Sequence, residues 1–319
     1  MLIDLSSNEN PYKPSQKVIN ALLNSTENIN RYVGVTELNV LKKKLSHYNQ
    51  ISEERIFIGP GTDFLINEVL MNFSKGRNIV TFNPSFFSSI EIAKYFVKKI
   101  IKIQLTPPEY SIDWSAFQEG SSIFILDNPN NPTGKCLLSK DDLTILLENK
   151  NNIVLIDEAY FEFSQVSFSN LLCCFPNLVV LRTLDKAFAL AGLKVSYLMA
   201  GDNLLKRLSL KNQSISRPAC NAAVAAVEDK DYSFECVKEI INERERLKKC
   251  LESLGLIVFP SQTNFLLVKT SLQELALRLK SKNILICDLS GTWFKDYYRI
   301  SVGNREDNNK LVEAIKELS

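Results

Sequence analysis

The chain has 319 residues, of which 38 are Lys or Arg and 36 are Asp or Glu, so its formal net charge is +2. At roughly 100–200 residues per domain, this length predicts one large unit or two coupled domains. Hydrophobic residues make up 45% and charged residues 23%, which is typical of globular proteins, and the balanced charge argues against a nucleic-acid or membrane-surface binder.

Histidine and cysteine chemistry is limited. The single histidine, His47, lies in the helical pattern LKKKLSHYN, so we expect it on a surface helix rather than in a hydrolase triad. The seven cysteines form no CxxC pair, and their odd number and irregular spacing favour reduced thiols over disulfides or a zinc site. The start, MLIDLSSNENPY, has no signal-peptide pattern, and no run approaches the ~20 apolar residues of a membrane span. We therefore expect a cytoplasmic protein without a metal site.

The first 200 residues alternate between helical and strand-like patterns. After a polar, Pro-containing arm, helices are expected at residues 15–23, 36–48, 63–73, 86–97 and 139–149. Continuous apolar runs, which are typical of buried strands, lie at 55–59, 78–82, 122–127, 152–157, 177–183 and 194–200. Buried strands separated by helices predict an α/β fold with a mostly parallel sheet and helices on both faces.

Beyond residue 200 the pattern becomes that of an α+β unit. Helices are expected at 202–212, 219–228, 232–254, 271–282 and from 305 onward. Short strands are expected at GLIVFP, TNFLLVK, NILICD and YYRISV. We therefore predict an N-terminal arm over residues 1–30, a large α/β domain over 31–228 and a smaller α+β domain over 229–319.

Polar residues follow three of the predicted strands. SIFILD leads into DNPNNPTGK, NIVLID into EAY, and NLVVLRT into LDK. Taken singly, these segments are also explained by a rigid turn, a helix cap and a solvated loop cation. Together they place Asn131, Asp157 and Lys186 at one sheet edge, where open α/β sheets bind ligands. Pyridoxal phosphate needs a Lys for a Schiff base and an acid to keep its ring nitrogen protonated, so these residues favour that cofactor.

A candidate phosphate site precedes them in the segment GPGTDFLINEVL, where a strand runs into a Gly-containing turn and a helix. The backbone N–H groups of Gly61, Thr62 and Asp63 at the helix start can bind a phosphate oxygen. An ordinary Thr/Asp-capped helix is the simpler explanation of this segment taken alone. It is not a P-loop, because no Gly-Lys-Ser/Thr follows.

Five motifs in this order resemble the fold-type I aminotransferases that use pyridoxal phosphate: SSNENPY, NPNNPTG, LIDEAY, LRTLDKAFALAGLKVSY and YYRISVGNREDNNKLVEAI. The resemblance covers nearly the whole chain. It is strongest to the histidinol-phosphate aminotransferase branch, which also contains threonine-phosphate decarboxylases and some aromatic aminotransferases. It implies the fold-type I architecture, bound pyridoxal phosphate and a homodimer with shared active sites.

The resemblance also implies roles for individual residues. Lys186 would anchor the cofactor covalently and move the substrate Cα proton, and Asp157 would pair with the pyridine nitrogen. Tyr160 and Asn131 would hydrogen-bond the phenolate oxygen. The remaining cofactor contacts would come from Phe86 on the ring and from Gly61, Thr62, Asp63, Thr183, Lys194 and the neighbouring subunit's Tyr32 at the phosphate. Phe86 and Tyr32 also fit plain core positions, because aromatic residues pack readily.

The substrate would be held by Arg299, whose planar fork suits a carboxylate or a phosphate, together with Asn10 and Tyr12. Three positions depart from the family pattern. Asp185 replaces a Ser or Thr and would repel the cofactor phosphate unless it turns away, is protonated or meets a cation. Lys194 replaces an Arg and offers a point charge rather than a fork. Cys287 stands where relatives often carry an Arg that helps bind an anionic substrate.

The leading hypothesis is an aminotransferase that exchanges an amino group between glutamate/2-oxoglutarate and a second substrate. Histidinol phosphate/imidazole acetol phosphate, in histidine biosynthesis, is the favoured second pair. An aromatic amino-acid aminotransferase and a threonine-phosphate decarboxylase are the alternatives within the same branch. A non-catalytic protein that keeps the fold as a binding module is the alternative of another class, because fold alone does not establish function.

Overall fold

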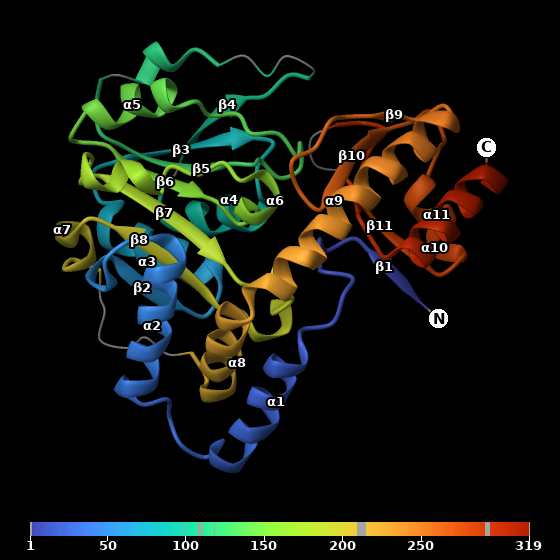
Figure 1. The fold of residues 1–319 in the computed structure, drawn as a ribbon. Coiled ribbons are helices and arrows are strands. Elements are labelled where there is room, and N and C mark those ends of the chain that lie inside the picture. Colours follow the sequence, from blue (N-terminus) through green and yellow to red (C-terminus); the bar gives the residue numbers. More distant parts are fainter. Residues whose placement is uncertain are drawn as a thin grey trace.

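The computed structural model describes residues 2–97, 99–107, 110, 112–117, 119–208, 215–290 and 294–318. The described chain contains a seven-stranded and a five-stranded sheet, each with its own helices (Figure 1). None of the described helices combines the length and the apolar character that a membrane crossing requires.

The large sheet has the strand order β2-β8-β7-β6-β5-β3-β4. Its strands are β2 (Ile56–Gly59), β3 (Asn78–Asn83), β4 (Ile100–Gln104), β5 (Ser122–Asp127), β6 (Ile153–Asp157), β7 (Leu178–Thr183) and β8 (Ser196–Ala200). Neighbours from β7 to β4 pair in parallel, and β8 runs antiparallel to both β7 and β2. The mostly parallel sheet is therefore confirmed. The sequence did not reveal β4, since Lys102 and exposed neighbours on this edge strand hide its apolar run.

Helices cover both faces of the large sheet. On one face lie α3 (Thr62–Phe73), α4 (Phe87–Lys94) and α7 (Asp202–Leu205). On the other lie α1 (Gln16–Ser25), α2 (Val35–Asn49), α5 (Lys140–Glu148), α6 (Phe161–Ser164) and α8 (Arg217–Glu228). Consecutive strand residues alternate between the two cores, for example Leu155 in one and Ile156 in the other. The sheet is thus buried on both faces, which explains its continuous apolar runs.

The predicted helices begin and end within a few residues of the observed ones, with one larger difference. The helix predicted at 202–212 is helical only over α7, and residues 209–212 lie outside the described part of the chain. His47 is exposed on α2, as predicted. Among the described residues, five short 3₁₀ helices complete this part: η1 (Thr26–Asn28), η2 (Glu53–Arg55), η3 (Trp114–Phe117), η4 (Ser169–Cys173) and η5 (Ala191–Leu193).

The small sheet has the order β1-β11-β12-β10-β9. Its strands are β1 (Ile3–Leu5), β9 (Ile257–Val258), β10 (Phe265–Lys269), β11 (Ile284–Asp288) and β12 (Tyr297–Ser301). Helices α10 (Leu275–Ser281) and α11 (Arg305–Leu318) pack on it, and the long α9 (Lys230–Ser253) crosses from the large unit toward it (Figure 1). The sequence did not reveal β1, because three residues are too short to show a period. The domain boundaries at 30/31 and 228/229 stay a prediction.

The topology brings functional loops together. The parallel strands β5, β6 and β7 end at Asp127, Asp157 and Thr183. Adjacent parallel strands present their carboxyl ends at one edge, so the segments that follow each strand share one side of the molecule. The start of α3 and the arm after β1 reach the same place, where both line one cavity.

Candidate active site

A cavity of about 360 Å³ lies at this edge. Its walls come from eight places in the chain, which explains why no single motif reveals it. The lining residues are Ser6, Ser7, Asn8, Pro60, Gly61, Thr62, Asp63, Phe86, Asp127, Pro129, Asn131, Asp157, Ala159, Tyr160, Thr183, Asp185, Lys186, Lys194 and Arg299. The structure thus brings together eleven of the fourteen predicted site residues; Asn10, Tyr12 and Tyr32 do not line this cavity.

Lys186 follows β7 and extends its amine into the cavity. Its Nζ donates to the backbone carbonyl of Ser7 at 3.3 Å. Burial lowers the pKa of Lys186, and the adjacent Asp185 carboxylate opposes this change. The Asn10 amide holds the backbone beneath, because its Nδ2 donates to the carbonyls of Lys186 at 3.0 Å and Ala187 at 3.1 Å. A lowered pKa increases the fraction of neutral amine, the form that acts as a base or nucleophile.

Asp157 is buried at the end of β6. One oxygen, Oδ1, accepts the backbone N–H of Ala159 at 3.0 Å. Burial raises the pKa of Asp157 to about 7, and the neighbouring Asp127 carboxylate adds to the increase. No described Lys, Arg or His side chain forms a salt bridge with it. A buried carboxylate without a cation is costly, so this site fits a ligand that brings an N–H or a positive charge.

Asp127, which is not among the residues predicted from sequence, occupies the corresponding place on β5. The two aspartates are register partners across the strands. Asp127 accepts hydrogen bonds from Ser85 Oγ at 2.8 Å, Asn130 Nδ2 at 3.0 Å and the backbone N–H of Asn131 at 2.8 Å. It therefore holds the NPNNPTG loop in place and orients Asn131. Its position at a strand end, like that of Asp157, was the signal that could have identified it.

Tyr160 and Asn131 form the side of the cavity nearest the small sheet. Asn8, which was not predicted either, donates from Nδ2 to the Tyr160 hydroxyl at 2.9 Å. Arg299 on β12 donates from Nη1 to Asn131 Oδ1 at 2.7 Å and from Nη2 to the Ser6 carbonyl. The third nitrogen of the guanidinium, Nε, is buried and has no partner. Arg299 is thus held by two polar groups and keeps its Nε–H for an anion.

The opposite side of the cavity carries the predicted phosphate contacts. Gly61 precedes α3 with φ +92°, a conformation that favours glycine, and Thr62 begins the helix. The first amides of a twelve-residue helix and the nearby Lys194 make this end suited to an anion. Thr183 Oγ1 accepts the backbone N–H of Asp185 at 3.1 Å. Burial raises the pKa of Asp185 to about 6.

The three predicted aromatic residues differ in whether they line the cavity. Phe86 lines the cavity. Tyr12 is partly buried against the main hydrophobic core, away from the cavity lining. Tyr32 is 99% exposed, and its carbonyl accepts a hydrogen bond from Arg217. A fully exposed tyrosine is not a core residue, so the plain packing explanation fails for Tyr32.

A second cavity of about 330 Å³ adjoins the first through Phe86, Asn131 and Arg299. Its other lining residues are Ser85, Phe87, Pro132, Cys287, Asp288 and Leu289. Cys287 on β11 is the cross-strand partner of Arg299. Of the described side chains that line this second cavity, only Arg299 is cationic.

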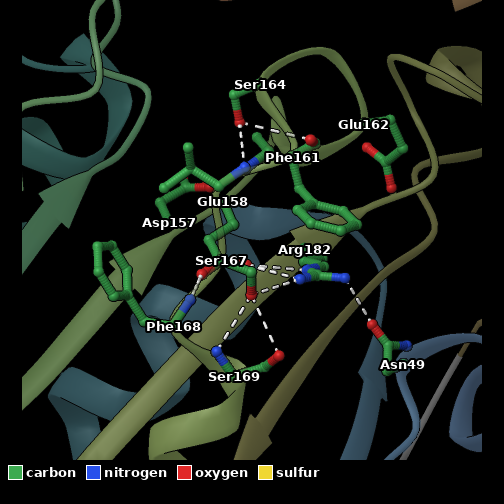
Figure 2. A network of polar contacts seen from close by, with 12 residues as sticks. Asn49, Asp157, Glu158, Phe161, Glu162, Ser164, Ser167, Phe168, Ser169 and Arg182 are labelled. Atoms are coloured by element: carbon green, nitrogen blue, oxygen red, sulfur yellow. Dashed lines mark hydrogen bonds and ion pairs between the residues drawn. The ribbon is translucent and has the colours of Figure 1, made fainter. Parts of the chain in front are cut away.

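A buried ion pair lies behind the strand ends (Figure 2). Arg182 donates from Nε and Nη2 to Glu158 Oε2 at 3.0 and 2.9 Å, from Nη2 to Ser167 Oγ at 2.7 Å and from Nη1 to Asn49 Oδ1 at 2.7 Å. Its guanidinium carbon lies 3.4 Å from the Phe161 ring centroid. The side chains of Arg182 and Glu158 are only 3% and 0% exposed.

This pair joins the two central strands directly behind the cavity. Glu158 follows Asp157 on β6, and Arg182 precedes Thr183 on β7. Asp157 and Thr183 line the cavity, whereas Glu158 and Arg182 do not. The ion pair therefore fixes the spacing of two cavity residues from outside the cavity.

The chain matches a family model described as "Aminotransferase class I and II" over residues 1–315. Histidinol-phosphate aminotransferase 1 of Oceanobacillus iheyensis is 33% identical to it, covering 99% of this chain and 92% of the relative. The crystal structure of histidinol-phosphate aminotransferase from Clostridium acetobutylicum superposes with a TM-score of 0.89 at 25% identity, covering 99% of both chains. That from Sinorhizobium meliloti, in complex with pyridoxal-5'-phosphate, gives a TM-score of 0.91 at 23% identity, covering 100% and 90% of the two chains. The chain therefore belongs to the aminotransferase class I and II family, the pyridoxal-phosphate-dependent enzymes of fold type I.

Proposed function

We propose that this enzyme exchanges an amino group between glutamate/2-oxoglutarate and histidinol phosphate/imidazole acetol phosphate, a step of histidine biosynthesis in the cytoplasm. The observation that carries the proposal is the convergence of Lys186, Asp157, Tyr160, Asn131 and Arg299 on one cavity. The relatives named histidinol-phosphate aminotransferase over nearly their whole length support the choice of substrate.

Pyridoxal phosphate, when bound, supplies a ring that accepts the electron pair left on the substrate Cα after deprotonation. Asp157 would accept the ring N–H and keep that nitrogen protonated. Tyr160 and Asn131 would hydrogen-bond the ring oxygen. Lys186 would anchor the cofactor and then take the proton from Cα, a role that its lowered pKa supports.

Arg299 would bind the anionic group of either substrate. Its Nε is buried and unpartnered, and a substrate anion would complete its hydrogen bonding. Asn131 and the Ser6 carbonyl preorganise the guanidinium before the substrate arrives. Because Arg299 also bonds Asn131, the substrate-binding and cofactor-binding groups are coupled.

A homodimer belongs to the same proposal. Tyr32 lies among other exposed apolar side chains in the segment from the end of α1 to the start of α2, namely Leu23, Ile29 and Val35. Apolar side chains gathered in one exposed segment favour burial against a partner. A second copy would cover them and would place Tyr32 at its partner's phosphate site. Sedimentation analysis of the wild type and of Tyr32→Glu tests this arrangement.

The visible spectrum of the cofactor-loaded enzyme, before and after adding histidinol phosphate, tests the substrate. Conversion of the yellow form to the pyridoxamine form, with imidazole acetol phosphate detected by mass spectrometry, is the expected result. A yellow enzyme that does not respond would refute this substrate while leaving the cofactor in place. Released carbon dioxide from phosphothreonine would instead support the decarboxylase.

One observation favours a second candidate, an aromatic amino-acid aminotransferase. The second cavity places the side chains of Phe86, Phe87 and Leu289 beside Arg299, and Cys287 adds no charge there. An aromatic ring fits such walls, and a single arginine suffices for one carboxylate. Turnover of phenylalanine exceeding that of histidinol phosphate would favour this candidate.

A further inference from the structure

Asp185 places a carboxyl group at the end of the cavity where the cofactor phosphate would bind. It lines the cavity with Gly61, Thr62 and Lys194. Its Oδ1 is buried and has no hydrogen-bond partner. Buried polar atoms are normally hydrogen-bonded, so an orphaned oxygen in a ligand cavity marks a contact that the ligand completes.

The backbone around Asp185 is fixed from both sides. The Leu184 N–H donates to the Val195 carbonyl at 2.9 Å, and the Asp185 N–H donates to Thr183 Oγ1 at 3.1 Å. On the other side, Asn10 holds the carbonyl of Lys186. These hydrogen bonds oppose any movement of the segment that would carry the carboxyl group away from a phosphate.

The charged and titratable groups around Asp185 come from every element that lines the cavity. Lys186 is its chain neighbour and Lys194 follows η5. The other elements contribute Asp63 on α3, Asp127 on β5, Asp157 on β6, Tyr160 after β6 and Arg299 on β12. No described lysine or arginine forms a salt bridge with Asp185.

Few of these charges can neutralise Asp185 once the cofactor is bound. In the proposed function Lys186 is covalently attached to the cofactor, and Arg299 is held by Asn131 and the Ser6 carbonyl. Of the described cations that line the cavity, Lys194 is then the one left for both a phosphate and a carboxylate.

One lysine cannot balance a phosphate dianion and an aspartate together. When two acidic groups share a buried site, one of them keeps its proton. The second ionisation of a phosphate ester has a pKa near 6. Burial raises the pKa of Asp185 to about 6 before any ligand arrives, so either group can hold a proton at little cost near this pH.

We propose that Asp185 is a cofactor-binding residue that acts as a neutral carboxylic acid, donating a hydrogen bond from its O–H to a phosphate oxygen, so that cofactor binding takes up one proton. The proton comes from solvent and stays on the Asp185–phosphate pair, and no other bond changes. This inference rests on pyridoxal phosphate being the cofactor. Under this inference, the Asp that replaces the family's Ser or Thr at position 185 contacts the phosphate in a pH-dependent way.

The test is a titration of the full-length apo chain with pyridoxal phosphate between pH 5.5 and 8.5, for the wild type, Asp185→Asn and Asp185→Ser. Linkage to one proton predicts that the ratio of wild-type to Asp185→Asn dissociation constants rises by up to about tenfold per pH unit between the pKa of the free groups and the higher pKa of the bound pair. We expect Asp185→Ser to bind at least about tenfold more tightly than the wild type at pH 8.5. At pH 5.5 the three proteins should bind alike.

Calorimetry of the same binding in two buffers of different ionisation enthalpy counts the protons directly. The wild type should take up about one proton more with pyridoxal phosphate than with pyridoxal, which lacks the phosphate. This comparison needs no variant, so it decides the question even if the variants do not fold. Equal proton uptake, or a wild-type to Asp185→Asn ratio that is constant with pH, would overturn the inference. A wild-type chain that binds neither compound would overturn the cofactor assignment as well.

Discussion

Removing Arg182 should destabilise the protein more than any surface charge change. Arg182→Met keeps much of the side-chain volume but deletes two hydrogen bonds to Glu158 Oε2, one to Ser167 and one to Asn49. It leaves the Glu158 carboxylate, which is 0% exposed, without its cation. Breaking a buried ion pair by removing one partner costs about 3–5 kcal/mol. The backbone N–H of Phe168 and the hydroxyl of Ser167 still donate to Glu158, which favours the lower end of that range.

Urea unfolding followed by circular dichroism measures this loss, with Lys310→Met as the matched control. Lys310 forms an ion pair with Glu306 at 2.6 Å, but the two side chains are 52% and 78% exposed. Exposed pairs contribute little, so the control should unfold at the wild-type midpoint. The double variant Arg182→Met/Glu158→Gln should recover most of the loss, because no unpaired charge remains. If Arg182→Met unfolds with the control, the ion pair is not what holds the strand ends together.

Four further outcomes follow from the cavity. Lys186→Ala should lose turnover by more than the ~10²–10⁴-fold typical of a general base and should lose the yellow colour; a yellow, active variant refutes its role. Asp157→Asn should weaken activity at equal cofactor occupancy, and normal kcat would contradict the ring-nitrogen contact. Because burial raises the pKa of Asp157 to about 7 from 3.8, ionising it costs free energy only in the folded state; stability of the apo protein should fall between pH 4 and 7, and less so in Asp157→Asn. Cys287→Arg should lower KM for phosphate esters relative to phenylalanine, since a second fork would face the anion, and an unchanged ratio would exclude position 287 from substrate choice.

The sequence predicts the large sheet well because its strands are buried on both faces and read as uninterrupted apolar runs. Edge strand β4 and the three-residue β1 could not be predicted, since half-exposed or very short strands show no uninterrupted apolar run. Asn131, Asp157 and Lys186 could be placed at one edge because they follow parallel neighbours. Asp127 shares this strand-end signal, but its hydrogen bond to the Asn131 backbone appears only in the structure. Asn8 follows no such strand, and its importance lies in a hydrogen bond to Tyr160.

Contacts between side chains that are distant in sequence could not be predicted either. Arg182 and Glu158 are one residue from predicted site residues, yet their pairing depends on the register of β6 against β7. The contact between Asn131 and Arg299 joins two sheets and needs the placement of one on the other. Local patterns carry secondary structure, whereas this geometry is a property of the assembled fold.

The arm after β1 joins the small sheet to the cavity. Strand β1, which precedes the arm, pairs with β11. In the arm, the Asn8 N–H donates to Ser301 Oγ, and the Asn8 carbonyl accepts a hydrogen bond from the Asn264 side chain. Arg299 in turn donates to the carbonyl of Ser6. Residues 2–8 and Arg299 therefore form one mechanical unit, and any rotation of the small sheet would carry Asn8, with its hydrogen bond to Tyr160, along with Arg299. A change in β1, such as Ile3→Pro, should then alter substrate affinity through the proposed contact of Arg299 with the substrate, although no residue of β1 lines the cavity.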